Sequence, residues 1–165
     1  GTVDVNGTVY SSQTGKVSVD ATRRIVSVKT AAGPPVVPEE GSTIIGMVEK
    51  IQEKMAIVQI IVVDDHKLDT PFTGMLHISS SSPRFERAMG EVCKPLDLIR
   101  AKVIDVTNRI PKLTTAGHGL GVVKAYCSKC GGELIFSGSI LRCKACRNVE
   151  RRRLADDFPR SGEAS

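Results

Sequence analysis

Residues 43–63 have the sequence TIIGMVEKIQEKMAIVQIIVV, and this stretch decides the fold class of the chain. It contains two apolar runs, residues 43–48 and 55–63, that are dense in β-branched side chains. Such side chains favour strands because they pack well on a pleated, half-buried surface. We therefore predict two consecutive strands here.

The sequence downstream predicts more strands of the same kind. A polar segment at 64–71 that contains a proline at its end is expected to be a loop, and residues 72–79 are expected to form a third strand. A last strand is predicted at 98–106, after an irregular segment that begins with a serine-rich run. Four or five short strands with one long excursion are typical of an OB-type barrel, a small closed β-fold. We predict an all-β fold organised around such a barrel at 41–115.

A short motif within the third predicted strand carries a family resemblance. Residues 74–79 are Gly-Met-Leu-His-Ile-Ser, and Gly-x-Leu-His-Ile-Ser in a third strand resembles the S-one RNA-binding domain, named after a ribosomal protein. The resemblance covers residues 41–115 and implies that His77, Arg100 and Lys102 face RNA. One departure is the second strand, which lacks the aromatic residue that this family usually carries on its binding face.

The composition fits a soluble globular protein that is poor in aromatic residues. The 165 residues are 41% hydrophobic but only 4% aromatic, and their formal net charge is +5. Because stacking on aromatic side chains is a main source of affinity for single strands, an RNA-binding protein of this composition must rely on charge and backbone contacts. No apolar run reaches the length of about 18 residues that a membrane span needs, and no leader pattern begins the chain. We therefore expect a soluble, cytoplasmic protein.

A small N-terminal unit precedes the predicted barrel, and a linker is predicted on each side of the barrel. Residues 1–30 alternate between polar and apolar in the manner of strands and predict a small β-meander, joined to the barrel by a stiff, proline-rich linker at 31–40. Thirty residues bury too little surface to be stable alone, so this unit is expected to pack on the barrel or on a partner protein. The glycine-rich segment 116–121 is expected to be a second linker, because residues 122–126 predict a strand and not the helix that a phosphate-binding loop needs.

The most specific motif is a pair of Cys-x-x-Cys sequences separated by twelve residues. Its cysteines are Cys127, Cys130, Cys143 and Cys146. Two such pairs supply four thiolates for tetrahedral Zn²⁺, and the residues between them favour a hairpin. We therefore predict a zinc ribbon at 122–150 with one structural Zn²⁺. The alternatives are two disulfides or a redox-active pair, although a thioredoxin-type motif has one Cys-x-x-Cys that opens a helix in a βαβ unit.

Basic residues gather near the second Cys-x-x-Cys and after it. The run Arg151, Arg152 and Arg153 follows the predicted ribbon, and the segment 151–165 is expected to be a basic and then flexible tail. Basic residues here can balance the negative charge of a four-thiolate site, or they can hold RNA phosphates. Both roles stay open, and the three arginines are candidates for RNA contact.

The sequence contains no constellation typical of a catalytic site. Asp64 and Asp65 are adjacent, so their side chains would diverge, and spacing places no third carboxylate beside them for a metal-assisted reaction. Cys93 lies outside both cysteine pairs and is expected to be a buried or idle thiol. We predict that the chain is not an enzyme.

The order of the three parts extends the resemblance to the whole chain. A β-meander, an S-one barrel and a zinc ribbon in this order resemble the archaeal exosome cap subunit of the Csl-four type. The resemblance implies a non-catalytic subunit of an RNA-degrading complex, with three copies on a ring of phosphorolytic nuclease subunits. It also implies that the N-terminal unit docks on the ring and that the barrel binds single-stranded RNA. The rival prediction is a structural adaptor that binds only proteins.

Overall fold

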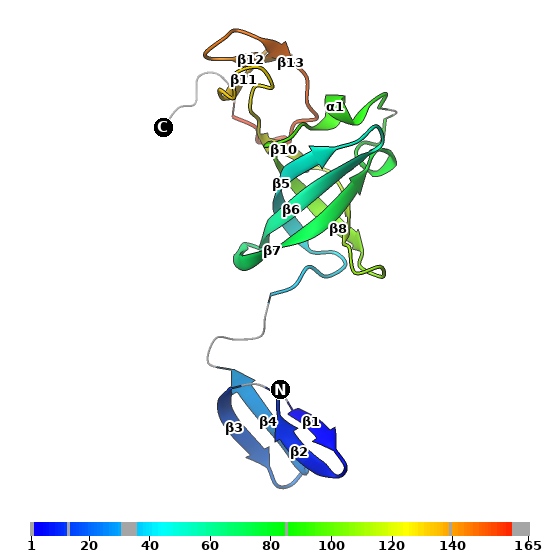
Figure 1. Cartoon of the computed structure of the whole chain (residues 1–165), viewed down its shortest axis with the longest axis vertical. Helices are drawn as coiled ribbons and strands as arrows, with labels where there is room; N and C mark the ends of the chain where they lie inside the picture. Colours follow the sequence, from blue (N-terminus) through cyan, green and yellow to red (C-terminus); the bar gives the residue numbers. More distant parts are fainter. Residues whose placement is uncertain (1, 13, 31–35, 85, 139, 160–165) are drawn as a thin grey trace. The chain divides into compact units, whose positions relative to one another are not determined.

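The structure is a computed structural model that describes residues 2–12, 14–30, 36–84, 86–138 and 140–159. It is built almost wholly of strands, with one short α-helix and one 3₁₀ turn in the described part (Figure 1). The chain divides into two compact units, Gly1–Val36 and Val37–Ser165. The predicted all-β fold, with its barrel and its cysteine-bearing ribbon, is confirmed.

The first unit consists of two antiparallel hairpins. Its strands are β1 (Thr2–Val5), β2 (Thr8–Ser11), β3 (Gly15–Asp20) and β4 (Ile25–Thr30), paired as β1 with β2 and β3 with β4. Asn6 and Gly7 join β1 to β2, and both have positive φ angles, as a two-residue hairpin turn requires. The predicted meander therefore takes the form of two separate hairpins.

The second unit contains a closed five-stranded barrel. Its strands are β5 (Thr43–Ile51), β6 (Met55–Val63), β7 (His66–His77), β8 (Leu98–Asp105) and β9 (Lys112–Thr114). The strand β9 runs parallel to β7 and antiparallel to β8, and this double pairing closes the barrel. A further strand, β10 (Gly121–Lys124), pairs with the free edge of β8.

The core fills the inside of the barrel because inward and outward residues alternate along its strands. On β8, for example, Ile99, Ala101 and Val103 are buried. Helix α1 (Met89–Val92) adds Met89 and Val92 to the same cluster, and the 3₁₀ turn η1 (Ile78–Ser80) follows β7 directly. The core continues from the barrel into the ribbon without a break.

The connection between β6 and β7 differs from the predicted loop at 64–71. Asp64 and Asp65 have φ angles of 44° and 67°, so they form a tight two-residue hairpin turn, and β7 begins at His66. The pairing then shifts, because Ile60 is opposite Phe72 whereas Val62 is opposite Lys67. Pro71 lies in this irregular part of the strand, where its missing N–H group costs no ladder hydrogen bond.

The ribbon is a three-stranded antiparallel sheet formed by β11 (Leu134–Ser137), β12 (Ile140–Cys143) and β13 (Val149–Glu150).

The segment after β13 was predicted to be a tail, and this prediction is wrong for the residues that the structure describes up to 159. Leu154 forms a parallel bridge with Val122 of β10, and Phe158 is buried in the common core. Gly121 permits this return: a Cβ atom there would lie 2.8 Å from the backbone nitrogen of Ala155. Residues 160–165 lie outside the described part.

Candidate functional site

The four cysteines of the ribbon lie together as the spacing predicts. Their sulfur atoms are all within 4.8 Å of one another, and the group could hold a metal ion. The Sγ atom of Cys146 is 3.6 Å from that of Cys127 and 3.4 Å from that of Cys130. A zinc ion about 2.3 Å from each sulfur would hold the sulfurs about 3.8 Å apart, so the cluster has the size of a tetrahedral site.

Each Cys-x-x-Cys pair forms a tight turn that directs its sulfurs to the centre of the cluster. The backbone N–H of Gly131 donates to the carbonyl of Cys127 at 2.9 Å, and the N–H of Arg147 donates to the carbonyl of Cys143 at 3.1 Å. Both donors follow a Cys-x-x-Cys pair and both have positive φ angles. A Cβ atom at Gly132 would lie 3.2 Å from the sulfur of Cys143, so the backbone packs closely around the cluster.

The pKa values of Cys127 and Cys130 are shifted in opposite directions. Burial would raise the pKa of Cys127, but hydrogen bonds led by the backbone N–H groups of Lys129 and Cys130 lower it to about 6. The N–H of Gly132 lowers the pKa of Cys130, but the neighbouring sulfurs of Cys143 and Cys146 outweigh it and raise that pKa to about 12. Four thiolates so close together repel one another, and a divalent cation among them would remove this repulsion.

A buried network of charged groups joins the ribbon to the barrel. Arg152 and Asp97 form an ion pair in which both side chains are 0% exposed. Asp97 also accepts hydrogen bonds from the backbone N–H groups of Lys94 and Tyr126, and Arg152 forms a second ion pair with Glu150 at 2.8 Å. The prediction that Arg152 contacts RNA is therefore wrong, because its guanidinium is enclosed and already paired. Nothing in the local sequence marks Asp97 as its partner.

The network also reaches the metal cluster. Glu150 accepts hydrogen bonds from the backbone N–H of Ser128 at 2.9 Å and from the side chain of Asn148 at 2.8 Å. The same Asn148 amide lies 3.6 Å from the sulfur of Cys127. Burial opposes the charge of Glu150, yet hydrogen bonds from Lys94, Ser128 and Arg152 hold its pKa below the ordinary value.

Of the three residues of the barrel predicted to contact RNA, His77 and Lys102 lie side by side across strand β9 on the outer surface. Leu76 of β7 is opposite Leu113 of β9, so the next residue, His77, lies beside Thr114. Thr114 is in turn opposite Lys102 of β8. His77 and Lys102 are both exposed, and two strand spacings place their backbones about 10 Å apart. The imidazole Nδ1 of His77 accepts a hydrogen bond from the N–H of Ser79, which fixes the ring at the start of η1.

Arg100 shares the outward face of β8 with Lys102, but its guanidinium is engaged. It pairs with Asp157 at 2.9 Å and donates to the carbonyl of Gly119 at 3.1 Å. Asp157 belongs to the returning C-terminal segment, which sequence reasoning placed in a tail. Arg100 therefore helps to hold this segment against the barrel.

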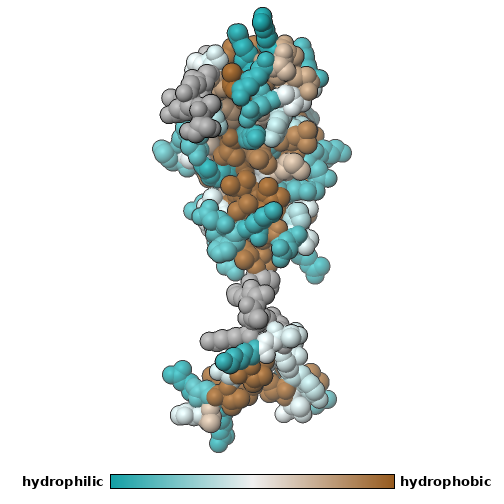
Figure 2. Space-filling view, turned by 90° about the vertical axis from the view of Figure 1, so that its left-hand side faces the viewer, coloured by the Kyte–Doolittle hydropathy of each residue, from teal (hydrophilic) through white to brown (hydrophobic). Residues whose placement is uncertain are grey.

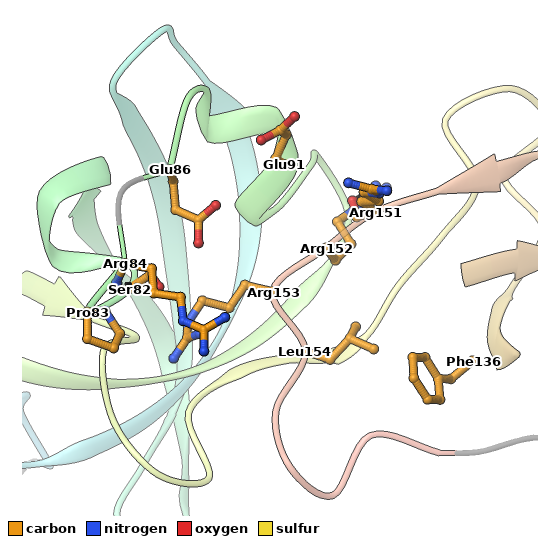
Figure 3. A pocket seen from close by; sticks show the side chains of 10 residues that line it. All are labelled: Ser82, Pro83, Arg84, Glu86, Glu91, Phe136, Arg151, Arg152, Arg153 and Leu154. Carbon is orange, nitrogen blue, oxygen red and sulfur yellow. Dashed lines mark hydrogen bonds between the residues drawn. The ribbon is translucent and has the colours of Figure 1, made fainter. Parts of the chain in front are cut away.

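A groove that the sequence did not reveal lies between the barrel and the ribbon (Figure 3). It has a volume of about 650 Å³ and is lined by residues 82–84, 86 and 91 of the barrel, Phe136 of β11 and residues 151–154. Arg84 and Arg151 are exposed, and Arg153 is half-buried with its Nε donating to the carbonyl of Thr115 at 3.3 Å. Cys93 lies outside the cysteine cluster and is buried, and this burial raises the pKa of its thiol to about 12.

The fold and the cysteine cluster define an all-β protein with an OB-type barrel and a ribbon that can hold a metal ion. The chain belongs to the Csl4 family of exosome components: it is 31% identical over 142 residues to the exosome complex component csl4 of Schizosaccharomyces pombe. This match covers 81% of the chain and 75% of that protein. The family predicted from the order of the three parts is thereby confirmed.

Two further relatives cover nearly the whole chain. The exosome complex component Csl4 of Archaeoglobus fulgidus is 25% identical over 160 residues, covering 96% of this chain and 86% of that protein. The component CSL4 of Mus musculus is 29% identical over 164 residues, covering 94% of this chain and 83% of that protein. No family model matches the chain. In the described part, no helix has the length and apolarity needed to cross a membrane.

Proposed function

We propose that the chain is a non-catalytic, RNA-binding cap component of an exosome. It holds single-stranded RNA on the outside of the barrel and helps to deliver it to the phosphorolytic ring. The main support for RNA binding is that His77 and Lys102 are exposed and aligned across β9 on a barrel of OB type. A copy number of three and a cytoplasmic location stay predictions.

The cysteine cluster, in this proposal, holds one structural Zn²⁺ through Cys127, Cys130, Cys143 and Cys146. The sulfur distances, the N–H donors around them and the four-sulfur donor set all suit this ion. Zinc in such a site supplies folding free energy and no reaction chemistry, because four protein ligands leave no position for a substrate. This role agrees with a subunit that has no catalytic function.

The first unit is proposed to be the part that docks on the ring. Its β3–β4 hairpin has one apolar face, since Val17 is opposite Val28 and Val19 is opposite Val26. Val17 and Val19 are 59% and 66% exposed, and the apolar surface is visible as brown atoms on this unit in Figure 2. Contiguous exposed apolar surface of this kind marks a protein contact.

The experiment for the RNA-binding part is a titration of labelled single-stranded RNA with the full chain at several salt concentrations. Lys102→Ala is expected to weaken binding and to lower the slope of log affinity against log salt by about 0.7, the share of one phosphate. Lys67→Ala is the matched control, because Lys67 is also exposed but lies at the opposite end of β7 from His77. A chain that binds no RNA would favour the adaptor instead.

A further inference from the structure

We propose that the groove between barrel and ribbon is a second RNA subsite, which binds a nucleotide of the same single strand. The inference rests on the proposed function and names where the RNA continues after the barrel face. The groove has a volume of about 650 Å³, which lies in the range of small-ligand sites, about 300–1,000 Å³, so a nucleotide fits.

The positive charge of the groove comes from three arginines on two separate segments. Arg84 belongs to the loop after η1, and Arg151 and Arg153 follow β13. Among the residues that the structure describes, none of these three arginines forms an ion pair. Arg152 differs, because Asp97 and Glu150 neutralise it. Planar guanidinium groups that are not paired with carboxylates are suited to bind phosphate in a bidentate manner.

Two carboxylates, Glu86 and Glu91, also line the groove and decide the orientation of the nucleotide. In Figure 3 Glu91 lies on helix α1 and Glu86 lies on the segment that precedes this helix. Phosphate oxygens are repelled by carboxylates. The sugar-phosphate backbone therefore runs along the arginines and away from Glu86 and Glu91.

Phe136 supplies an aromatic surface in the groove. The second barrel strand carries no aromatic residue, whereas Phe136 is half-buried on β11 and lines the ribbon end of the groove with Leu154 (Figure 3). A base that stacks on an aromatic ring gains affinity without regard to its identity. The groove thus combines a stacking surface with phosphate-binding groups, which is the combination that single-strand sites use.

Hydrogen bonds connect the groove to the end of strand β9, which lies between His77 and Lys102. Thr114 lies between these two residues, and the carbonyl of the next residue, Thr115, accepts the hydrogen bond from Arg153. Thr114 also donates to the carbonyl of Ser80, two residues before Ser82 at the groove. In this proposal, one strand of RNA passes from the barrel face into the groove.

The test is an RNA titration of the full chain with its metal site loaded, comparing variants inside and outside the groove. The double variant Arg84→Ala, Arg151→Ala removes two exposed guanidinium groups and is expected to lower the salt slope by about 1.4, the share of two phosphates. Arg142→Ala is the control, because Arg142 is exposed on β12 but does not line the groove. It is expected to leave the slope within about 0.3 of the native value.

Phe136→Leu tests the stacking part separately, because leucine keeps an apolar side chain on β11. The affinity is expected to fall at least about fivefold, while Phe136→Tyr keeps the ring and restores binding. If the intact chain binds RNA but the arginine double variant and Phe136→Leu bind it unchanged, the groove proposal is overturned and the proposed function stands. If the intact chain binds no RNA, both fail.

Discussion

The ion pair between Arg152 and Asp97 lies at the junction of barrel and ribbon, where neither side chain is exposed. Burial raises the pKa of Asp97, and the Arg152 guanidinium opposes this rise. A buried pair of this kind adds little net stability when compared with an apolar pair of the same shape. Removing only one partner is different, because the remaining charge is then enclosed without compensation.

Arg152→Met is therefore expected to lower the free energy of unfolding by about 3–5 kcal/mol, the usual cost of an orphaned buried charge. Urea unfolding followed by circular dichroism measures this loss. Arg151→Met is the matched control, because the neighbouring side chain is exposed and its removal should change stability by less than about 0.5 kcal/mol. Equal effects of the two substitutions would contradict the assigned role of Arg152.

Glu150 adds a pH dependence to the same junction. Its pKa is held below the ordinary value of 4.5, although burial alone would raise it. A carboxylate with a lowered folded-state pKa stabilises the protein fully above its unfolded pKa, and this contribution is lost as the pH falls below it. Urea midpoints are thus expected to fall below about pH 4.5 in the native chain, and to fall less in Glu150→Gln. Parallel pH profiles for the two proteins would contradict this.

Local sequence predicted some of these residues and could not predict others. The four cysteines were predictable because two short, repeated motifs contain the whole ligand set. Asp97 and Arg152 are 55 positions apart, and only tertiary folding brings them together. The groove escapes prediction for the same reason, since Arg151 and Arg153 look like part of a solvated basic run until the segment after β13 returns to β10 and brings them near Arg84.

The ribbon is an element with a small core of its own. Its three short strands contribute Leu134 and Leu141 to the buried cluster, and two of the four clustered cysteines, Cys127 and Cys143, are buried as well. A metal ion is thus expected to supply much of its folding free energy, with structural zinc contributing about 10–16 kcal/mol in comparable small units.

Chelation, or Cys143→Ser, is therefore expected to unfold the ribbon from about residue 125 to 150 and to leave the barrel folded. Strand β10 should survive, because its partner is β8 of the barrel. Metal analysis and hydrogen exchange measured by mass spectrometry test this expectation. Cys93→Ala is the control, since this buried cysteine lies outside the cluster and should leave the metal content unchanged. Freshly purified protein without zinc would contradict the zinc assignment.

At the scale of the whole molecule, the two units differ in how much core they have. In the first unit, Val28 is the only buried hydrophobic side chain among the described residues. The second unit has a continuous core that runs from barrel to ribbon. A unit with so little buried surface is marginally stable alone, so a partner protein that covers its apolar faces would stabilise it.

Val19→Asp is expected to abolish binding of the chain to the exosome ring, because it places a charge in the middle of the apolar face of β3. Ser18→Asp is the matched control, since Ser18 is the adjacent residue and points to the opposite face of the same strand. Co-purification of each variant with the ring subunits measures the difference. Retention of Val19→Asp on the ring would show that another surface makes the contact.

The return of the C-terminal segment to β10 has a mechanical consequence. The ribbon leaves the barrel through β10, which pairs with β8, and the chain comes back beside β10 at Leu154. A domain anchored through a single strand can be peeled away one hydrogen bond at a time, whereas one anchored at both ends must break its attachments together. If RNA is pulled across the groove, the force on the ribbon is shared by its two attachments to the barrel, strand β10 and the segment at Leu154.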